Sequence, residues 1–468
     1  NSEEQLLNIA GQKIGNFLLK KFKNKSLLFI CGKGNNGQDG IKASKFLKHK
    51  IKNKVFLVSK TYSKKKLNTL QSSIESHEVL VDCLFGTGIN RTLSKFHQKI
   101  IEMINSSKRK IISVDIPSGL NSDTGSPQGC SVIASVTICM GFYKPAHFLI
   151  PSKNYCGEKV LLKLPLKIPP KSTPKIHLLK KDKIFNFLPK HNNSISKYDK
   201  GHVVVIGGIM SGAARLVAFA SRKVGAGLST ILVSPDHLKY YTKCDPGTIV
   251  AEYSDKQLIK KDVLVIGPGL GKDYDKNFIK KIILKFDGKI IVDADAISIF
   301  ENQKTEFYQL IKKKKSLILT PHRGEFKKIF ESSENKLIDC FNASKLVSNI
   351  ILYKGNDTVI SNPNGNVWIN SNASNSLATA GSGDLLCGLI SGLVAQKMKI
   401  NLSVLAAVCI QNDLSNRKNN VVVEDFLADI PLVMNTIKNN NWFKDNNVVF
   451  YILFSGRGGI GRRARFRF

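Results

Sequence analysis

The sequence predicts an α/β protein with two domains, each built around a mainly parallel sheet with helices on both faces. Short β-branched runs alternate with Lys-bearing helical patterns in two stretches, which is typical of βαβ units. A Pro- and Lys-rich run, KIPPKSTPK, and the polar run KHNNSISK separate the two stretches. We therefore expect domains at 1–165 and 198–439, a linker at 166–197 and an irregular basic tail at 440–468. The 468 residues suffice for two hydrophobic cores.

The formal net charge of +36 raises the question of a nucleic-acid partner. The lysines, however, are spread along the whole chain rather than gathered in a stripe with aromatic residues. Lys, Asn, Ile and Phe are abundant together, which is the codon bias of an AT-rich genome. We therefore expect no nucleic-acid partner, although the positive field would help to attract anionic nucleotides.

Apolar runs and cysteine spacing indicate a soluble, cytoplasmic protein. The longest apolar run near the end, at 448–454, is far shorter than the ~20 residues of a membrane span. Nine cysteines occur without a CxxC pair or a Cys/His cluster, which indicates a reducing compartment and no structural zinc. Because the chain begins with Asn1 and not with Met, we expect a further segment upstream. We also expect a homo-oligomer that does not bind membranes.

A glycine-rich turn follows the first predicted strand, in SLLFICGKGNNGQDGIKASKFLK. Its glycines let backbone amides approach a phosphate at the start of the next helix. Such a pattern alone often only packs a tight turn. Here Asn35, Asn36 and Asp39 add amides and a carboxylate, which suit a cation or a sugar–nicotinamide group better than bare packing does.

Two further predicted strands also end in polar residues. Asp82 ends the strand in VDCLFGTGINRT, and Asp115 and Ser118 follow the strand in ISVDIPSGLNSDTG. Each residue alone is explained as well by an Asx-turn or a helix cap. Because ligands of open α/β sheets bind outside the carboxyl ends of the strands, three strand ends of this kind predict one shared site.

These motifs and the later segment TICMGFYKPAH resemble the NAD(P)H-hydrate epimerase family over about residues 3–165. The resemblance implies a Rossmann-like three-layer αβα domain, Asp115 as the catalytic acid/base with Lys144 nearby, and K⁺ bound by Asn36, Asp82 and Ser118. Gln38 stands where the family usually has Gly, so we expect added bulk inside the binding loop. The residues implied in substrate binding are Asn35, Asn36, Gly37, Gln38, Asp39, Gly86, Thr87, Gly88, Ile89, Asn90, Arg91, Thr92 and Asp115.

In the second domain the most specific motif is SNSLATAGSGDLLCGLISGLVAQ. Gly381 and Gly383 open a helix whose first turn holds Asp384. Amides at a helix N-terminus form an anion hole, and a carboxylate beside it can take a proton from a hydroxyl during phosphoryl transfer. Asp is also common in first helical turns because of the helix dipole, but the ATAGSG approach favours catalysis.

Six motifs in order, from KYDKGHVVVIGG and DVLVIGPGLG through TPHRGEF and YKGNDTVI, resemble the ADP-dependent NAD(P)H-hydrate dehydratases of the ribokinase-like superfamily. The resemblance implies a three-layer αβα domain, catalysis by Asp384, ADP (or ATP) as phosphoryl donor and Mg²⁺. The turn GGIMSGA is about two residues shorter than usual, which we expect to reshape the substrate mouth. The implied hydrate contacts are Ala213, Gly269, His322 and Asp384. The implied nucleotide contacts are Lys354, Gly355, Asn356, Asp357, Thr358, Ser374, Asn375, Ser376, Leu377, Ala378, Thr379, Ala380, Gly381, Ser382 and Gly383.

The two halves in this order resemble the bifunctional NAD(P)H-hydrate repair enzymes. That resemblance implies epimerisation of R and S hydrates, followed by nucleotide-dependent dehydration of the S hydrate to NAD(P)H with release of AMP and phosphate. The choice between ADP and ATP, and between the NADH and NADPH hydrates, stays open.

Three other functions remain as alternatives. A ribokinase-like small-molecule kinase is disfavoured by the fused first domain and by TPHRGE. A binding module that keeps the first domain only as a scaffold is disfavoured by Asp82, Asp115 and Ser118. A Rossmann oxidoreductase is disfavoured because no acidic residue follows the first glycine loop at the expected ~20-residue distance.

Overall fold

The computed structural model describes residues 2–58, 64–166, 175–192, 194–271, 274–333, 335–417, 421–439 and 451–452. Contacts divide the chain into two units, the first comprising 1–172 and 450–468 and the second comprising 173–449. The predicted tail at 440–468 lies outside the described residues, apart from the two-residue strand β17 (Tyr451–Ile452). Within the described ranges, no helix combines the length and the apolar character that crossing a membrane requires.

The first unit is a six-stranded parallel sheet in the order β2-β1-β3-β4-β5-β6. Its elements, in chain order, are α1 (Glu3–Phe22), β1 (Leu27–Cys31), α2 (Asn35–Phe46), β2 (Asn53–Leu57), α3 (Lys64–Glu75), β3 (Val79–Cys83), α4 (Lys95–Ser106), β4 (Lys110–Val114), β5 (Val136–Met140), η1 (Pro145–His147), η2 (Ser152–Tyr155) and β6 (Glu158–Leu162).

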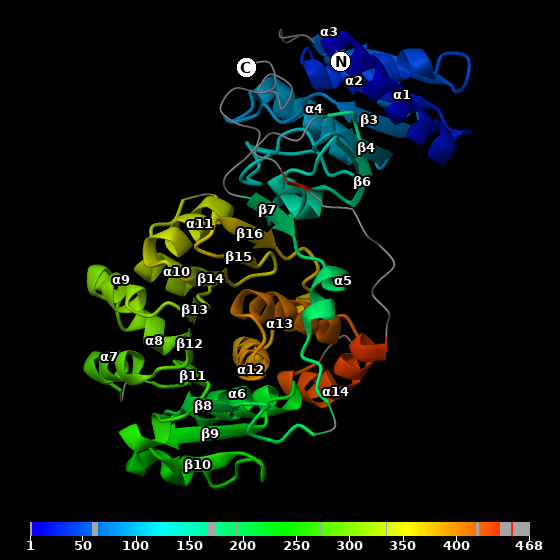
Figure 1. The fold of residues 1–468 in the computed structure, drawn as a ribbon. Helices are drawn as coiled ribbons and strands as arrows, with labels where there is room; N and C mark the ends of the chain where they lie inside the picture. Colours follow the sequence, from blue (N-terminus) through cyan, green and yellow to red (C-terminus); the bar gives the residue numbers. More distant parts are fainter. Residues whose placement is uncertain are drawn as a thin grey trace. The chain divides into compact units, whose positions relative to one another are not determined.

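Helices cover both faces of this sheet, so a central strand such as β1 can be apolar along its whole length. LLFIC of β1 is buried at every position. Because neighbouring side chains of a strand point to opposite faces, Phe29 packs in the core beneath α1 and α2, and Ile30 packs in the core beneath α3 and α4. The predicted three-layer αβα arrangement is thereby confirmed for this half (Figure 1).

The second unit is built on a mixed sheet whose order is β10-β9-β8-β11-β12-β13-β14-β15-β16-β7. Neighbouring strands are parallel from β10 to β14, and β15 is antiparallel to both of its neighbours. The elements, in chain order, are β7 (Lys175–Leu178), α5 (Lys181–Ile184), η3 (Phe185–Phe187), β8 (His202–Ile206), α6 (Ser211–Lys223), β9 (Leu228–Val233), η4 (Pro235–Tyr241), β10 (Ile249–Glu252), η5 (Asp255–Leu258), β11 (Val263–Ile266), α7 (Lys276–Lys285), β12 (Lys289–Val292), α8 (Asp295–Ser298), α9 (Lys304–Lys312), β13 (Leu317–Leu319), α10 (Arg323–Ile329), α11 (Lys336–Val347), β14 (Ile350–Tyr353), β15 (Val359–Ser361), β16 (Asn366–Ile369), η6 (Asn375–Leu377), α12 (Ser382–Ala395), α13 (Ile400–Ser415) and α14 (Val423–Asn439).

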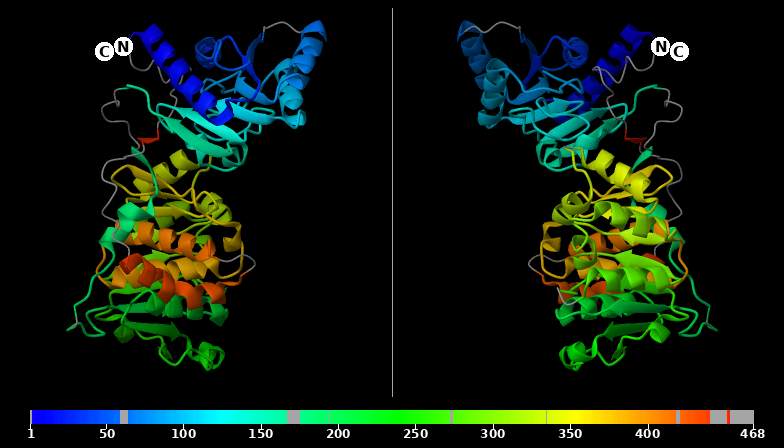
Figure 2. Two further views of the ribbon diagram at one scale, coloured as in Figure 1. Left: turned by 90° about the vertical axis from the view of Figure 1, so that its right-hand side faces the viewer. Right: turned by 90° about the vertical axis from the view of Figure 1, so that its left-hand side faces the viewer.

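This sheet also lies between two helical layers, as predicted. Helices α7 to α11 lie on one face, and α6, α12, α13 and α14 lie on the other (Figure 1). Figure 2 shows the C-terminal helices, orange to red, gathered within the second unit. Helix α12 is apolar on nearly every side because it packs between α6, α13 and the sheet.

The structure differs from the prediction in the segment 166–197, for which we expected a linker. Residues 175–178 form β7, which pairs in parallel with β16, and 181–184 form the short helix α5. Ile176 and Ile184 are buried against the second unit. The surrounding Pro and Lys residues hide this strand in the sequence, because four residues are too few for a clear alternation.

Candidate active sites

The first candidate site lies at the carboxyl edge of the first sheet. The strand order is β2-β1-β3-β4, so the chain passes from β1 to β2 on one side, whereas β3 and β4 lie on the other side of β1. The crevice between β1 and β3 is therefore the topological switch point of the sheet. Asn36 follows β1, Asp82 ends β3 and Asp115 follows β4. The structure therefore brings together the three strand ends that the sequence singled out.

A chain of hydrogen bonds joins Asn36 to Asp82. The Asn36 side-chain amide donates to the Phe85 carbonyl (2.7 Å), the Phe85 N–H donates to Ser118 Oγ (2.8 Å), and Ser118 Oγ donates to Asp82 Oδ1 (2.6 Å). The other amide atom, Asn36 Oδ1, is buried and has no hydrogen-bond partner. A buried oxygen of this kind costs free energy unless something binds it.

Asp82 is almost completely buried, and its hydrogen-bond partners are neutral. The Ser113 hydroxyl, the Leu84 N–H and both donors of Ser118 reach its two oxygens at 2.6–3.2 Å. Burial raises the pKa of Asp82, and these hydrogen bonds oppose the rise. A carboxylate held this way favours a cation nearby.

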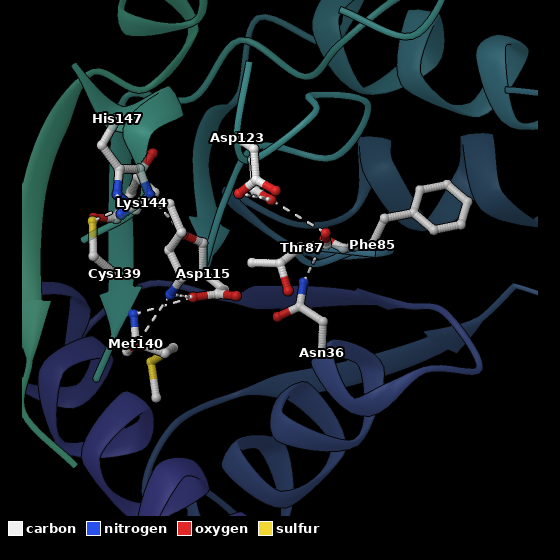
Figure 3. Close-up of polar contacts among 11 residues, drawn as sticks. Asn36, Phe85, Thr87, Asp115, Asp123, Cys139, Met140, Lys144 and His147 are labelled. Carbon is white, nitrogen blue, oxygen red and sulfur yellow. Dashed lines mark hydrogen bonds and ion pairs between the residues drawn. The ribbon is translucent and has the colours of Figure 1, made fainter. Parts of the chain in front are cut away.

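Asp115 lies beside this chain and forms an ion pair. The backbone of Gly86 lies between the side chains of Asn36 and Asp115. A Cβ placed on Gly86 would lie 3.3 Å from Asn36 Cβ and 3.7 Å from Asp115 Oδ2, so the two side chains are close to each other. Lys144 Nζ pairs with Asp115 Oδ1 and also donates to the Met140 carbonyl at 2.9 Å. Figure 3 shows the Asp115 carboxylate between Lys144 and Asn36.

The remaining predicted substrate residues occupy the segments around this pair. Thr87 lies next to Asn36 in Figure 3, and its carbonyl accepts a hydrogen bond from Ser122 (3.2 Å). Ile89 is buried, whereas Gly88 and the run 90–92 are exposed. The sequence NNGQDG forms the first turns of α2 and not a loop, and Gln38 is exposed on that helix. Our prediction that Gln38 lies in a loop is therefore wrong, and its added bulk at the substrate stays a prediction.

The second candidate site lies at the corresponding edge of the second sheet, where β8 and β11 meet at its switch point. Gly267 follows β11 with φ +125°, and a Cβ there would lie 1.7 Å from the Asp293 carbonyl, so only glycine fits. A Cβ on Gly269 would lie 2.8 Å from Ala213 Cβ, so these two predicted hydrate contacts are neighbours. In the short turn before Ala213, Ile209 and Met210 are about half exposed (47% and 53%).

A buried ion pair forms the centre of this site. Lys354 Nζ, after β14, lies 2.6 Å from Oδ1 of Asp293, which follows β12. Burial opposes the positive charge of Lys354, but the neighbouring anionic groups, with Asp293 first, raise its pKa overall. Cys387 Sγ lies 3.3 Å from the second oxygen of Asp293. The negative charge of Glu325 also raises the pKa of Lys354, and burial raises the pKa of Glu325 itself.

His322 caps the helix that carries Glu325. Its Nδ1 accepts hydrogen bonds from the N–H groups of Gly324 (2.9 Å) and Glu325 (3.1 Å), and its side chain is 59% exposed. In return Glu325 accepts a hydrogen bond from the His322 N–H at 2.8 Å. The predicted hydrate contact is thus an exposed cap residue, and its Nε2 lies 3.3 Å from Glu325 Oε1.

Asp384 lies in the first turn of α12, as predicted from the sequence. The helix begins after Gly381, which has the left-handed φ of +81°, and a Cβ on Gly383 would lie 3.5 Å from Lys354 Nζ. Burial raises the pKa of Asp384 to about 6; the charge of Asp293 adds to the rise, and Lys354 opposes it. Asp384 is thus a carboxylate that can gain and lose a proton near neutral pH.

The two segments predicted to bind the nucleotide, 354–358 and 374–383, lie at the N-terminus of α12. In the first, Thr358 Oγ1 donates to the Gly355 carbonyl (2.6 Å), and Lys336 holds Asp357 in an ion pair (2.6 Å). The second contains the short helix η6, whose cap is Ser374. The Gln411 side chain donates to the Ser382 carbonyl at 2.7 Å and so fixes the α12 N-terminus.

Sequence reasoning did not assign roles to four residues of these sites, namely Asp293, Glu325, Lys336 and His147. The first two were visible as acidic residues just after strands, in VDADAIS and TPHRGEF. His147 ends the motif TICMGFYKPAH, but that motif alone gives it no role. No sequence signal marks Lys336, because it acts on residues brought near by the fold.

Comparisons with known proteins identify the family. One family model, described as NAD(P)H-hydrate dehydratase, matches residues 203–429, and another, described as YjeF-related protein N-terminus, matches 3–74 and 57–146. The bifunctional NAD(P)H-hydrate repair enzyme of Coxiella burnetii is 30% identical over 449 residues, covering 89% of this chain and 90% of its own length. This chain belongs to the family of bifunctional NAD(P)H-hydrate repair enzymes. The resemblance inferred from the motifs is therefore confirmed.

Other members and relatives agree with this assignment. The family member of Dictyoglomus turgidum is 28% identical over 482 residues, covering 92% of both chains. Among solved structures, a ribokinase-like superfamily protein of Enterococcus faecalis aligns with a TM-score of 0.50 and 23% identity, covering 58% of this chain and 99% of that one. This likeness confirms the ribokinase-like fold of the second unit.

Proposed function

We propose that this chain repairs hydrated NADH and NADPH in two steps, each catalysed by one unit. The first unit interconverts the R and S hydrates, and the second dehydrates the S hydrate with ADP as phosphoryl donor. The observation that carries the proposal is the same in both units: a carboxylate, Asp115 or Asp384, stands near a lysine at the carboxyl edge of its own sheet. The corresponding domains are 1–165 and 198–439, and the segment 166–197 between them includes β7 and α5, which belong to the second unit. Assaying the R hydrate alone, and then the S hydrate with ADP, tests each step.

In the epimerase site, Asp115 is the proton-transfer group. The two hydrates differ in configuration at one hydroxyl-bearing carbon, so interconversion needs a bond to that carbon to break and re-form, with a proton removed and returned in the process. The ion pair with Lys144 keeps the carboxylate aimed, and the proton that Asp115 takes is given back in the same cycle. The substrate would lie along Asn35, Asn36, Gly37, Gln38 and Asp39 and along Gly86, Thr87, Gly88, Ile89, Asn90, Arg91 and Thr92.

Asn36, Asp82 and Ser118 fit a monovalent cation. Asn36 Oδ1 is buried without a partner, and Asp82 is a buried carboxylate whose hydrogen-bond partners are all neutral. Amide, hydroxyl and carboxylate oxygens are ligands suited to such an ion. A bound K⁺ would supply the positive charge that keeps Asp82 ionised, while the protein groups hold the α2 N-terminus and the 85–88 segment together.

Epimerisation is therefore expected to depend on K⁺. Exchanging K⁺ for tetramethylammonium, which is too large for a buried oxygen site, should lower the epimerase rate by about tenfold or more, since a loss of only ~1.4 kcal/mol of stabilisation has that effect. Asn36→Leu removes the orphaned oxygen and with it the response to added K⁺. Epimerase assays over a K⁺ titration measure this. Equal epimerase rates with and without K⁺ would show that epimerisation needs no cation. The dehydratase rate of the same samples controls for general ion effects.

In the dehydratase site, Asp384 takes the proton of the hydrate's hydroxyl as that oxygen attacks the β-phosphorus of ADP. The P–O bond to AMP breaks and AMP leaves. The phosphorylated hydrate then loses phosphate, together with a proton from the neighbouring ring carbon, as the ring double bond forms, giving NAD(P)H. Hydroxide is a poor leaving group at neutral pH and phosphate is a good one. The amides at Gly381, Ser382 and Gly383 stabilise the phosphoryl group in transit.

The nucleotide would lie against the two segments on either side of α12. These comprise Lys354, Gly355, Asn356, Asp357, Thr358, Ser374, Asn375, Ser376, Leu377, Ala378, Thr379, Ala380, Gly381, Ser382 and Gly383. Among the described residues no group of three carboxylate, His or Cys side chains is placed to hold a metal, so Mg²⁺ would be bound mainly through the nucleotide phosphates. The hydrate would contact Ala213, Gly269, His322 and Asp384.

Dehydration is expected to lose rate as the pH falls through about 6. Asp384 must be ionised to accept the hydroxyl proton, and burial raises its pKa to about 6. Below that pH the protonated form dominates, so kcat for the S hydrate should fall about tenfold per pH unit. A pH profile of dehydration measures this. A flat profile from pH 5 to pH 8 would show that Asp384 is not the base.

The cellular setting belongs to the same proposal. All nine cysteines are free thiols, and seven of them are buried, which suits a reducing cytoplasm. We propose a cytoplasmic homo-oligomer whose partners are the NADH and NADPH hydrates and ADP.

A further inference from the structure

His147 makes hydrogen bonds to both residues of the epimerase ion pair. It ends η1, the short helix after β5, and is completely buried. Its Nε2 lies 2.8 Å from the backbone carbonyl of Asp115, and its Nδ1 accepts the backbone N–H of Lys144 at 3.0 Å. One imidazole ring therefore joins the main chain of the acid/base candidate to the main chain of its cationic partner (Figure 3).

These two contacts set the protonation of the ring. A carbonyl oxygen only accepts and an amide N–H only donates, so Nε2 carries the proton and Nδ1 is bare. Burial lowers the pKa of His147 to about 3, and the charge of Lys144 lowers it further. The ring is therefore neutral and in one tautomer at physiological pH. Cys139 Sγ lies 3.6 Å from Nε2, on the β5 side.

The backbone that His147 holds is an unusual one. Asp115 has φ +69°, which is uncommon for a residue other than glycine and needs support from its surroundings. The Asp115 N–H donates a hydrogen bond to the Ile138 carbonyl (2.7 Å), and the Asp115 carbonyl accepts one from the His147 ring. On the other side, Lys144 Nζ reaches Asp115 only because the chain turns back at 144–147.

We propose that His147 is a positioning residue of the epimerase: it fixes the main chain at Asp115 and Lys144 and thereby holds the Asp115 carboxylate and the Lys144 ammonium in the geometry for proton transfer. This inference rests on the proposed role of Asp115. His147 does not itself touch the substrate, because its two nitrogens are engaged by the main chain.

Two variants separate positioning from simple packing. His147→Phe keeps a buried ring and removes both hydrogen bonds; His147→Gln keeps an N–H that can reach the Asp115 carbonyl. We expect His147→Phe to lower epimerase kcat by about 100-fold with KM within about threefold, since a misplacement of about 1 Å at the reacting groups has this effect. His147→Gln should recover about tenfold of that loss. Cys139→Ala, which alters a neighbour of the same ring but neither hydrogen bond, is the matched control and should stay within about twofold of the wild type.

The measurement is epimerase kinetics on the R hydrate, normalised to binding sites counted by equilibrium titration with the hydrate. A His147→Phe chain with unchanged kcat per site overturns the proposal, and so does a loss of sites at constant kcat per site, because that is a packing effect. If His147→Phe is insoluble, His147→Gln decides: it must lie measurably below the wild type in kcat per site and not in KM. Full epimerase activity in Asp115→Asn would remove the proposed function itself, whereas an inactive Asp115→Asn beside a fully active His147→Phe removes only the positioning role.

Discussion

Replacing Asp384 by Asn is expected to lower the rate of dehydration by about 10²–10⁴-fold, the usual contribution of a general base. Asn keeps the size of the side chain and its place in the first turn of α12 but has no basic oxygen at neutral pH. Substrate binding should change little, because the amides of the helix N-terminus remain. The rate of NAD(P)H formation from the S hydrate with saturating ADP measures the effect.

Epimerisation by the same Asp384→Asn chain is the internal control and should stay within about twofold of the wild type, since the first unit has its own site. Glu301→Gln is a matched neutralisation in the second unit. Glu301 pairs with Lys328 at 3.0 Å on the surface, and such pairs contribute little. If Asp384→Asn still dehydrated at more than a few per cent of the wild-type rate, another residue would have to be the base.

Replacing Asp115 by Asn is expected to stop epimerisation, with a loss of about 10²-fold or more. Asn is the residue best suited to this test, because it tolerates the left-handed backbone that Asp115 adopts, at φ +69°. The substitution removes the proton acceptor and leaves Lys144 without its carboxylate. With ADP present, this variant should convert the S hydrate and then stall on the R hydrate.

The time course of NAD(P)H recovery from mixed hydrates measures the Asp115→Asn effect. The first, fast phase should equal the S fraction of the mixture, and the remainder should appear only at the spontaneous epimerisation rate. Glu102→Gln, on the surface of α4 in the same unit, should give complete recovery like the wild type. Complete and rapid recovery by Asp115→Asn would exclude Asp115 as the acid/base.

The sheets could be predicted from the sequence because their strands are continuous apolar runs followed at once by glycine turns. VLVIGPGLG and LLFICGKG show this pattern directly. The strand β7 could not be predicted in the same way. His177 in β7 contacts Asn366 in β16, 189 residues away, so the edge position of this strand depends on a pairing that no local pattern reports.

The candidate sites were predicted in part. Strand-end acids such as Asp82 and Asp115 stand out because parallel strands end at one edge. The pairing of Asp293 with Lys354 joins residues 61 positions apart, and that of His147 with Asp115 joins residues 32 positions apart. Neither follows from spacing. The error on Gln38 has a local cause: a glycine-rich sequence that looks like a loop is the start of a helix.

The central claim is that one chain performs both repair steps, and a mixture of R and S hydrates tests it most directly. The purified protein is given the mixture with K⁺, Mg²⁺ and excess ADP, and the dihydronicotinamide absorbance and free phosphate are followed together. All of the hydrate is expected to return to NAD(P)H in one rapid phase, with one phosphate released for each NAD(P)H formed. Recovery that stops at the S fraction, or that proceeds without stoichiometric phosphate, would contradict it.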